Sequence, residues 1–467
     1  MLEFTPNLNA HHNEPLYMQL YNYIKKEIKT GNLPTNTKLP SKRKLSTYLQ
    51  ISQNTIETAY GQLLAEGYIE AMPRRGYFVC ELEQANFMIK RDVQFVEEKK
   101  HKEQFFDYDF TYAGVDAGSF PFGVFRKITN EVLRIENEQV LSLGHPQGDF
   151  GLRETIAKYL FESRGVHCSP SQIILGAGTP YLLSLLFKLL HGSKFAAEDP
   201  GYHRRLFLHG QNIVDVQLIP LDQGGIILSD LEQSGANIVC VSPSHQFPCG
   251  MIMPISQRMQ LLNWAEKEVN RFIIEDDYDS EFRYSGKPIP ALQGLDKYEK
   301  VIYMSTFSKA LLPSIRISYM VLPPPLIKKY QDELFFYSQT VSRIDQDVLK
   351  RFMQQGYWEK HIQKVRVVYQ KKRDLLISTI SSYFPDTVDI IGQDSGLHIL
   401  IRPNNGLNEQ ELIDKAAEFS IKVYPVSPYG RNDDQTVLLG FATLTEQEIV
   451  EAIQLLAKAW FFKKRVC

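Results

Sequence analysis

The chain has 467 residues and a formal net charge of −2. At about 150 residues per domain, this length predicts roughly two to four domains. Hydrophobic residues make up 43% of the chain and charged residues 23%, which argues against collagen-like repeats, coiled-coil rods and long disordered segments. No apolar run reaches the roughly 18 residues that a membrane span needs. Five scattered cysteines without a CxxC pair argue against a disulfide framework and a zinc module, so we expect a cytoplasmic protein without a bound metal or a membrane anchor.

Positive charge gathers in the first 80 residues, where nine lysines and arginines face six glutamates, for a net charge of +3. Apolar residues recur every four positions from Leu16 to Ile28, which predicts a first helix. Ser41 and Ser52 are placed to cap a second and a third helix, and Gly67 ends the third. Two β-rich runs then flank a basic turn at 73–76, which predicts a hairpin, or wing.

Two short helices joined by a tight turn indicate a helix-turn-helix, whose second helix enters the major groove of DNA. Glutamine and asparagine side chains can read adenine edges, while lysines and arginines contact phosphates. The residues that we expect to face DNA are Lys42, Arg43, Lys44, Ser52, Gln53, Asn54, Thr55, Thr58, Arg74 and Arg75. A three-helix protein-interaction module with solvated lysines is the alternative interpretation of the same pattern.

A longer motif favours DNA binding over the protein-interaction module. The run from Leu39-Pro40-Ser41 through Glu66-Gly67-Tyr68 to Phe78-Val79 resembles the GntR winged helix-turn-helix. The resemblance implies a DNA-binding domain over residues 10–80 and operator DNA as a partner. The next segment, 81–105, has 11 charged residues out of 25 and little periodicity, which predicts a linker; a charged helix is the alternative.

From residue 106 to the end, short apolar runs alternate with helical patterns. The strand-like runs are 173–175, 238–241, 272–274 and 301–304, and the clearest helical patterns are 181–190 and 255–269. This alternation predicts an α/β fold built on buried parallel strands. Functional residues are then expected directly after the strand ends.

Three polar motifs follow those runs. The glycine-rich segment 176–179 would open a helix whose free N–H groups suit a phosphate. The acidic segment 275–281 needs a cationic partner, either a metal or a protonated pyridine nitrogen. Lys309 lies among hydroxyl residues with Arg316 seven positions on, which suits an amine that forms a Schiff base beside an anchored phosphate.

The ordered set of these motifs resembles the fold-type I, class I aminotransferases over most of residues 106–467. The resemblance implies a large domain with a mixed, mainly parallel sheet and pyridoxal 5'-phosphate as cofactor. Lys309 would be the internal-aldimine lysine, Asp276 would pair with the pyridine nitrogen, and Tyr278 would hydrogen-bond the ring oxygen. The residues that would stack on the ring or cradle the phosphate are Tyr202, Ala177, Gly178, Thr179, Thr306, Ser308 and Arg316. The ring-oxygen asparagine of that family is missing from the segment 246–250.

The combination of both halves resembles the MocR regulators of the GabR type, as do the segments 242–248, 273–282 and 306–313. This resemblance implies a homodimeric transcription regulator that senses an amino effector, which is γ-aminobutyrate in the GabR type, or pyridoxal phosphate itself. Arg204 and Arg431 would meet the carboxylate of the effector. A working aminotransferase with an accessory DNA-binding domain is one alternative, and a DNA-binding protein with an inactive α/β unit is another.

Overall fold

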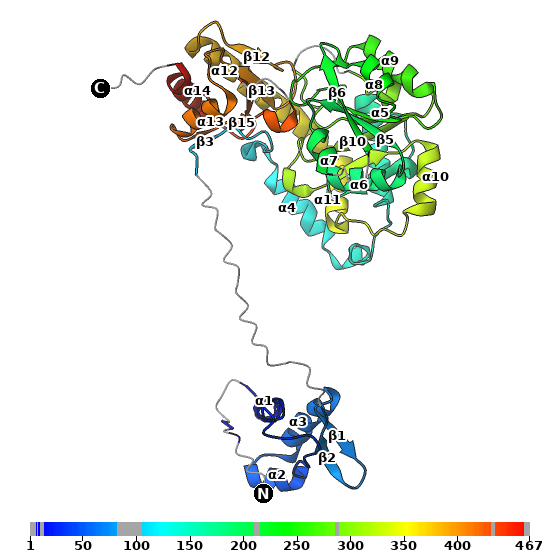
Figure 1. The fold of residues 1–467 in the computed structure, drawn as a ribbon, viewed down its shortest axis with the longest axis vertical. Coiled ribbons are helices and arrows are strands. Elements are labelled where there is room, and N and C mark those ends of the chain that lie inside the picture. The colour runs from blue at the N-terminus through cyan, green and yellow to red at the C-terminus, as the bar shows by residue number, and fades with distance from the viewer. Residues whose placement is uncertain are drawn as a thin grey trace, which may run out of the picture. The chain divides into compact units, whose positions relative to one another are not determined.

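The computed structural model describes residues 6, 8–9, 14–81, 105–209, 215–284, 289–430 and 435–461. The chain divides into two compact units, residues 1–103 and 104–467, and each is described by itself (Figure 1). Residues 82–104, which make up nearly all of the predicted linker, lie outside the described residues. Within the described part of the chain, no helix has the length and apolar character of a membrane span.

The first unit consists of three helices and a hairpin in its described part. The elements are α1 (Leu16–Lys29), α2 (Lys42–Leu49), α3 (Gln53–Ala65), β1 (Ile69–Met72) and β2 (Gly76–Val79), with β1 and β2 antiparallel. Both predicted caps form: the Ser41 Oγ accepts from the Lys44 N–H at 3.3 Å, and the Ser52 Oγ from the Thr55 N–H at 3.1 Å. Each cap satisfies a backbone donor that the helix start leaves open, and the cap of Ser52 fixes the start of α3.

The core of this small unit is a single hydrophobic cluster from all three helices and the hairpin. Leu20, Ile24, Ile56 and Tyr60 are fully buried in it. The Tyr60 hydroxyl donates to the carbonyl of Pro40 at 3.0 Å, which ties α3 to the segment before α2. One face of each helix is therefore occupied by packing, and the opposite faces remain for a partner.

The second unit is built on a large sheet. Its strands are β4 (Ile173–Gly176), β5 (Lys194–Asp199), β6 (Asp215–Asp222), β7 (Gly225–Ile226), β8 (Ile238–Val241), β9 (Phe272–Asp276), β10 (Val301–Thr306) and β11 (Ser318–Val321). Over the described residues they lie in the order β4-β11-β10-β9-β8-β5-β6-β7. The neighbours from β10 to β6 are parallel, whereas β11 and β7 pair antiparallel, so the sheet is mixed and mainly parallel as predicted.

The strand β4 departs from the expected parallel pairing. It pairs antiparallel with β11, which is a strand that the periodicity did not indicate. Because β11 is also antiparallel to β10, β4 still runs in the direction of the parallel strands. The carboxyl ends of β4, β9 and β10 therefore meet at one edge of the sheet, and the three polar motifs come together there.

Helices bury both faces of this sheet. The major helices are α4 (Phe122–Val132), α5 (Phe150–Arg164), α6 (Thr179–Leu189), α7 (His203–His209), α8 (Leu228–Gln233), α9 (Ile255–Glu266), α10 (Pro324–Glu333), α11 (Arg343–Gln354) and α12 (Tyr357–Tyr383). Alternate residues of β4 point into different hydrophobic clusters: Ile174 packs with residues of α6, while Ile173 and Leu175 pack with residues of α5 and α12. The predicted helices 181–190 and 255–269 correspond to α6 and α9, which end one and three residues earlier.

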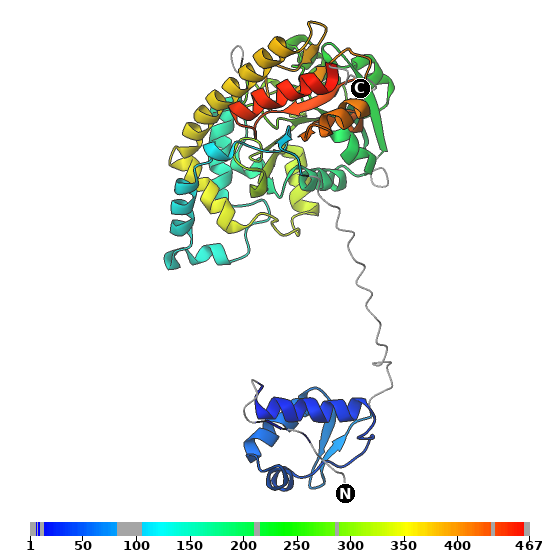
Figure 2. The ribbon, with the colours of Figure 1, turned by 90° about the vertical axis from the view of Figure 1, so that its left-hand side faces the viewer.

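A smaller sheet completes the unit near the C-terminus. Its strands β12 (Asp389–Ile391), β13 (His398–Arg402), β16 (Val437–Gly440) and β15 (Tyr424–Pro425) are antiparallel, and α13 (Glu409–Ala417) and α14 (Glu446–Phe461) pack beside them. The helices α12 and α14 lie side by side (Figure 2). A short parallel pair, β3 (Tyr108–Asp109) with β14 (Ile421–Lys422), joins the beginning of the unit to this region.

Candidate functional site

A cavity of about 270 Å³ lies at the carboxyl ends of β9 and β10. Eight of the ten residues predicted for the cofactor line it, namely Thr179, Tyr202, Asp276, Tyr278, Thr306, Ser308, Lys309 and Arg316. Ala177 and Gly178 directly precede Thr179 in the turn from β4 to α6. The cavity also contains residues to which the sequence patterns assigned no role, among them Tyr112, Asp279 and His398.

Lys309 follows β10 by three residues and extends into this cavity. Its Nζ donates to the carbonyl of Tyr112 at 2.5 Å and lies 5.1 Å from the centre of the Tyr112 ring. Burial lowers the pKa of Lys309 to about 8, although the carboxylate of Asp279 opposes the shift. A lysine with this pKa has a substantial neutral fraction near neutral pH, and the neutral amine is the nucleophile in Schiff-base chemistry.

Asp276 is the last residue of β9 and is only 3% exposed. Its Oδ2 lies 2.8 Å from the Nε2 of His203, the first residue of α7. Its Oδ1 is buried and has no hydrogen-bond partner among the described residues. A buried carboxylate oxygen without a donor is costly unless a ligand supplies one, and a protonated pyridine nitrogen is such a donor. His203 was missed at the sequence level because a lone histidine carries no pattern.

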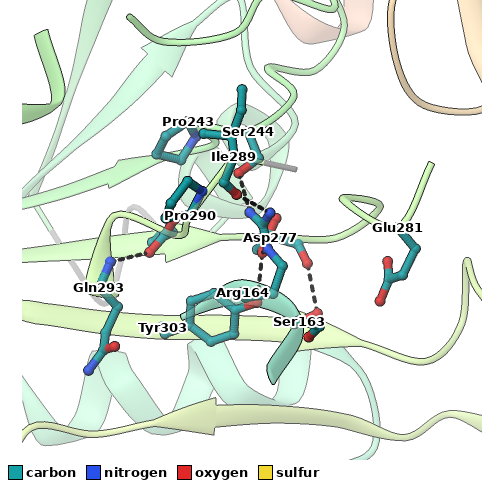
Figure 3. Close-up of polar contacts among 12 residues, drawn as sticks. Ser163, Arg164, Pro243, Ser244, Asp277, Glu281, Ile289, Pro290, Gln293 and Tyr303 are labelled. Atoms are coloured by element: carbon teal, nitrogen blue, oxygen red, sulfur yellow. Dashed lines mark hydrogen bonds and ion pairs between the residues drawn. The ribbon is translucent and has the colours of Figure 1, made fainter. Parts of the chain in front are cut away.

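The neighbouring Asp277 belongs to a separate, internally paired network. Arg164, from the end of α5, donates to the Asp277 Oδ2 at 2.8 Å, and the Tyr303 hydroxyl donates to the same oxygen at 2.6 Å. Figure 3 shows this guanidinium bonding to Ser244 and to the carbonyl of Ile289 as well. Asp277 is therefore paired within the protein, whereas Asp276 lines the cavity and keeps one oxygen available for a ligand.

Three hydroxyl side chains and an arginine form one wall of the cavity. The Ser318 Oγ donates to the Thr306 Oγ1 at 2.9 Å, and the Thr306 Oγ1 donates to the Ser308 Oγ at 3.0 Å. Gly178 has a φ of +95°, and a Cβ at this position would lie 2.0 Å from the Arg316 Nη2. The close approach of Gly178 to Arg316 is therefore possible only for glycine. Hydroxyls, a guanidinium and a helix N-terminus together fit a phosphate.

The segment 246–250 has no asparagine for the ring oxygen. Gln246 does not replace it, because its Nε2 donates to the carbonyls of Pro200 at 2.8 Å and Phe247 at 2.7 Å. Tyr278 lines the cavity, and its hydroxyl lies 3.0 Å from the Nδ1 of His245. The side chain of His245 is buried next to the site, a position that no sequence pattern indicated.

Of the two residues predicted to bind the effector, Arg204 is among the described residues and Arg431 is not. Arg204 forms an ion pair with Asp199 at 2.8 Å and is not among the described residues that line the cavity. Arg431 lies outside the described residues, directly after Gly430. A Cβ on Gly430 would come within 2.6 Å of the Arg204 Nη1, so Arg204 packs against the segment that leads to Arg431.

Most of the predicted DNA-facing side chains are exposed on the first unit. The exposed residues are Arg43, Lys44, Ser52, Gln53, Asn54, Thr58, Arg74 and Arg75, whereas Lys42 and Thr55 are half-buried. Lys42 pairs with Glu57 at 2.6 Å, and Ser52 serves as the cap of α3. Arg75 lies with its guanidinium 5.4 Å from the ring centre of Phe78 at the wing. The second and third helices therefore present a polar and basic face.

Comparisons with known proteins find a matching family for each of the two units. Residues 16–79 match the model of the bacterial regulatory proteins of the gntR family, and residues 113–456 match that of aminotransferase class I and II. The HTH-type transcriptional regulator YdeL of Bacillus subtilis is 44% identical over 465 residues, which cover 98% of this chain and 100% of YdeL. The probable rhizopine catabolism regulatory protein MocR of Rhizobium meliloti is 30% identical over 470 residues, which cover 96% of this chain and 94% of MocR.

A solved structure shares the fold of the second unit. The kynurenine aminotransferase of Pyrococcus horikoshii, in complex with PMP, matches with a TM-score of 0.66 and 26% identity, covering 77% of this chain and 91% of that chain. The cofactor of this aminotransferase family is pyridoxal phosphate, and the free oxygen of Asp276 and the Gly178–Arg316 wall fit it. The chain therefore belongs to the MocR-type transcription regulators, in which a DNA-binding GntR domain is joined to a domain of the class I and II aminotransferases.

Proposed function

We propose that this regulator holds pyridoxal phosphate covalently at Lys309 and changes its affinity for operator DNA when an amino compound, or the cofactor itself, binds. The observation that carries the proposal is the pairing of Lys309 with Asp276. A half-buried lysine with a pKa of about 8 and a buried carboxylate with a free oxygen line the same cavity. Pyridoxal phosphate supplies an aldehyde that condenses reversibly with amines, and such a group can report an amine.

The side chains of the cavity have distinct parts in this proposal. Asp276 accepts a hydrogen bond from the protonated ring nitrogen, and His203, with its Nε2 2.8 Å from the Asp276 Oδ2, holds that carboxylate in place. Arg316 and the hydroxyls of Thr306 and Ser308 anchor the phosphate. Tyr202 covers the ring. These groups fix the position of the cofactor. The exchange of Lys309 for another amine is then the change that shifts the protein between its conformations.

We propose an amino acid with a distal carboxylate, such as γ-aminobutyrate, as a candidate effector. Arg204 would provide the cation for this carboxylate by leaving its ion pair with Asp199, and Arg431 would be a second cation. The side chains of this pair are 28% and 26% exposed, so breaking it costs at least on the order of 1 kcal/mol, which the carboxylate of the effector would offset. Arg204 would then exchange the carboxylate of Asp199 for that of the effector. Because Arg204 packs against Gly430, this exchange would link effector binding to the segment at Gly430.

We also propose that the second unit forms a homodimer in the cytoplasm. Phe122, Ile135, Leu141, Leu143 and Phe150 are large apolar side chains that are 58% to 93% exposed, and they all fall between residues 122 and 150. Such a concentration of exposed apolar groups marks an interaction surface. The segment 143–148 lies within this stretch.

The test is an absorbance titration of the purified, cofactor-loaded protein with candidate amines, beside operator binding on the same samples. We expect each effective amine to change the absorbance of the cofactor and the operator affinity over the same concentration range. Borohydride reduction should label Lys309, and Lys309→Ala should abolish the label and the amine response. A protein that stays colourless with the cofactor would contradict the proposal and would support the interpretation of an inactive α/β unit.

A working aminotransferase is the second candidate, and the complete set of Lys309, Asp276 and Arg316 in one cavity favours it. A steady-state assay with several amino donors and 2-oxoglutarate separates the two functions. Turnover on the order of 1–10 s⁻¹ is ordinary for an enzyme and would establish catalysis as the main activity. We expect turnover far below this range.

A further inference from the structure

His245 lies four residues after β8 and is 2% exposed. Its Nδ1 is 3.0 Å from the Asp279 Oδ1 and 2.9 Å from the Asp279 Oδ2. The same Nδ1 is 3.0 Å from the Tyr278 hydroxyl. One ring nitrogen therefore faces a carboxylate and a phenol, and both of these groups line the cofactor cavity.

The hydrogen-bonding rules of the three groups restrict where the protons lie. An ionised carboxylate only accepts, so Nδ1 must carry a hydrogen in order to bond Asp279. An Nδ1 that carries a hydrogen cannot accept the Tyr278 proton. Burial, with the charges of Asp279 and Asp276, raises the pKa of Tyr278 well above its usual value, so its hydroxyl keeps its proton. That proton then has no acceptor on His245 and is available to a ligand in the cavity.

The other side of the His245 ring is consistent with this tautomer. Its Nε2 is buried, and so is the Ser395 Oγ; neither has a hydrogen-bond partner among the described residues. Both residues line a small cavity of about 10 Å³, together with Arg164 and Arg283. A space of this size holds one water molecule, which can donate to Nε2 and accept from Ser395. The cavity is compatible with Nε2 as the accepting nitrogen, while the contact with Asp279 makes Nδ1 the donating one.

The ring is also fixed sterically. Gly396 has a φ of +75°, and a Cβ there would lie 2.0 Å from the His245 Cε1, so only glycine allows the ring this position. His398 faces the ring with centroids 5.3 Å apart. Burial lowers the pKa of His398 to about 3, so His398 stays neutral. The groups that face His245 are therefore one carboxylate, one neutral phenol, one neutral imidazole and the guanidiniums of Arg164 and Arg283 across the small cavity.

We propose that His245 is a positioning residue: by giving its Nδ1 hydrogen to Asp279, it leaves the Tyr278 hydroxyl to donate to the ring oxygen of pyridoxal phosphate. The segment 246–250 lacks the asparagine that would contact this oxygen, so Tyr278 is the donor on which the cofactor relies. Without His245, the Asp279 carboxylate loses its donor and attracts the Tyr278 proton away from the cavity. This inference rests on the cofactor site of the proposed function and assigns a further residue to it.

The test measures the pH midpoint of the absorbance change of the bound cofactor. A hydrogen bond to the ring oxygen stabilises its anionic form, so losing the bond raises the midpoint. We expect Tyr278→Phe and His245→Leu each to raise it by about one pH unit, the shift that a typical charge-assisted hydrogen bond produces. His245→Asn matches leucine in size but keeps an N–H near the Nδ1 position, so it should retain a midpoint close to that of the unsubstituted protein.

A double variant separates positioning from general packing. In the Tyr278→Phe background, His245→Leu should add no further shift, because the hydroxyl that it positions is gone. Tyr159→Phe removes a buried hydroxyl elsewhere, which bonds Glu281 at 3.0 Å, and should leave the midpoint unchanged. Borohydride labelling of Lys309 and unchanged operator affinity would show that each variant is folded and loaded.

An unshifted midpoint in His245→Leu, or an equal shift with and without the Tyr278 hydroxyl, would overturn the inference. In both cases the protein still binds its cofactor, and the proposed function stands. If the unsubstituted protein takes up no cofactor, the proposed function fails first and this inference fails with it. A shift in His245→Asn as large as that in His245→Leu would also overturn it, since the asparagine keeps the donor.

Discussion

At the scale of single residues, two side chains of the site are in unfavourable surroundings. Lys309 is shielded from water, and the Asp276 Oδ1 has no hydrogen-bond donor among the described residues. Each is a costly arrangement in the protein alone, because burial disfavours the charged lysine and leaves the carboxylate oxygen unsatisfied. A cofactor bound as proposed would relieve both, which would explain why a stable fold retains them.

The lowered pKa of Lys309 predicts how cofactor loading depends on pH. The neutral amine reacts, and its fraction rises about tenfold per pH unit until the pH passes the pKa. With a pKa of about 8, the rate of loading should rise from pH 6 to 8 and level off above 8. Stopped-flow absorbance of cofactor-free protein mixed with pyridoxal phosphate measures this profile. A rate still rising steeply at pH 9.5 would indicate an ordinary lysine with a pKa near 10.5.

Gly178 provides a second prediction at this scale. Its Cβ position lies 2.0 Å from the Arg316 Nη2, so Gly178→Ala should displace the guanidinium from the phosphate wall. Losing one charge-assisted hydrogen bond, worth about 1.5–3 kcal/mol, should weaken cofactor binding by roughly 10-fold to 100-fold. Gly192→Ala is the matched control, because Gly192 also has a positive φ, +83°, but has open space around it. Equal affinities of the two variants in equilibrium dialysis would contradict the role given to Arg316.

At the scale of elements, we expect the wing and the third helix to have separate roles in DNA binding. Gln53 and Asn54, exposed at the start of the third helix, are expected to read bases, and Arg74 and Arg75, at the exposed turn of the hairpin, to contact phosphates. Contacts with phosphates contribute to the affinity for DNA but do not distinguish one base sequence from another.

Neutralising the wing should therefore weaken binding to every DNA sequence alike. Arg74→Gln with Arg75→Gln should also lower the slope of log affinity against log salt by about 1–2, since each lost phosphate contact accounts for about 0.9. The matched control, Lys328→Gln with Lys329→Gln, removes two charges from α10 in the other unit. Fluorescence anisotropy over a salt series gives the slope, and an unchanged slope would remove the wing from the DNA contact.

The elements also show where sequence patterns suffice. The four-residue periodicity of α1 and the capping serines of α2 and α3 predict helices correctly, because their determinants are local. The antiparallel pairing of β4 with β11 was not predictable, since an isolated apolar run does not reveal its neighbours. The same holds for His203 and His245: each acts through a residue that is distant in sequence, Asp276 or Asp279, and no spacing rule connects them. The motif residues themselves follow strand ends, and eight of the ten meet in one cavity.

At the scale of the whole molecule, the exposed apolar residues between 122 and 150 predict a dimer contact. Ile135 and Leu143 are 93% and 92% exposed. Burying such side chains at an interface gains about 1.5–3 kcal/mol each, so Ile135→Glu with Leu143→Glu should weaken the dimer by at least tenfold. Val269→Glu is the control, because Val269 is 91% exposed but lies elsewhere, three residues before the start of β9. Sedimentation velocity measures the dimer, and equal dimer stability in both variants would locate the contact elsewhere.

The hydroxyls of Thr306, Ser308 and Ser318 bond one another within the protein. Removing the vitamin B6 group would therefore leave none of these three hydroxyls without a hydrogen-bond partner, because the three side chains bond one another. A regulator depleted of its vitamin would then keep this wall of the pocket intact and could be refilled. Vitamin supply and amine supply would then act on the same pocket in sequence, because an amine can respond only where the cofactor is already bound.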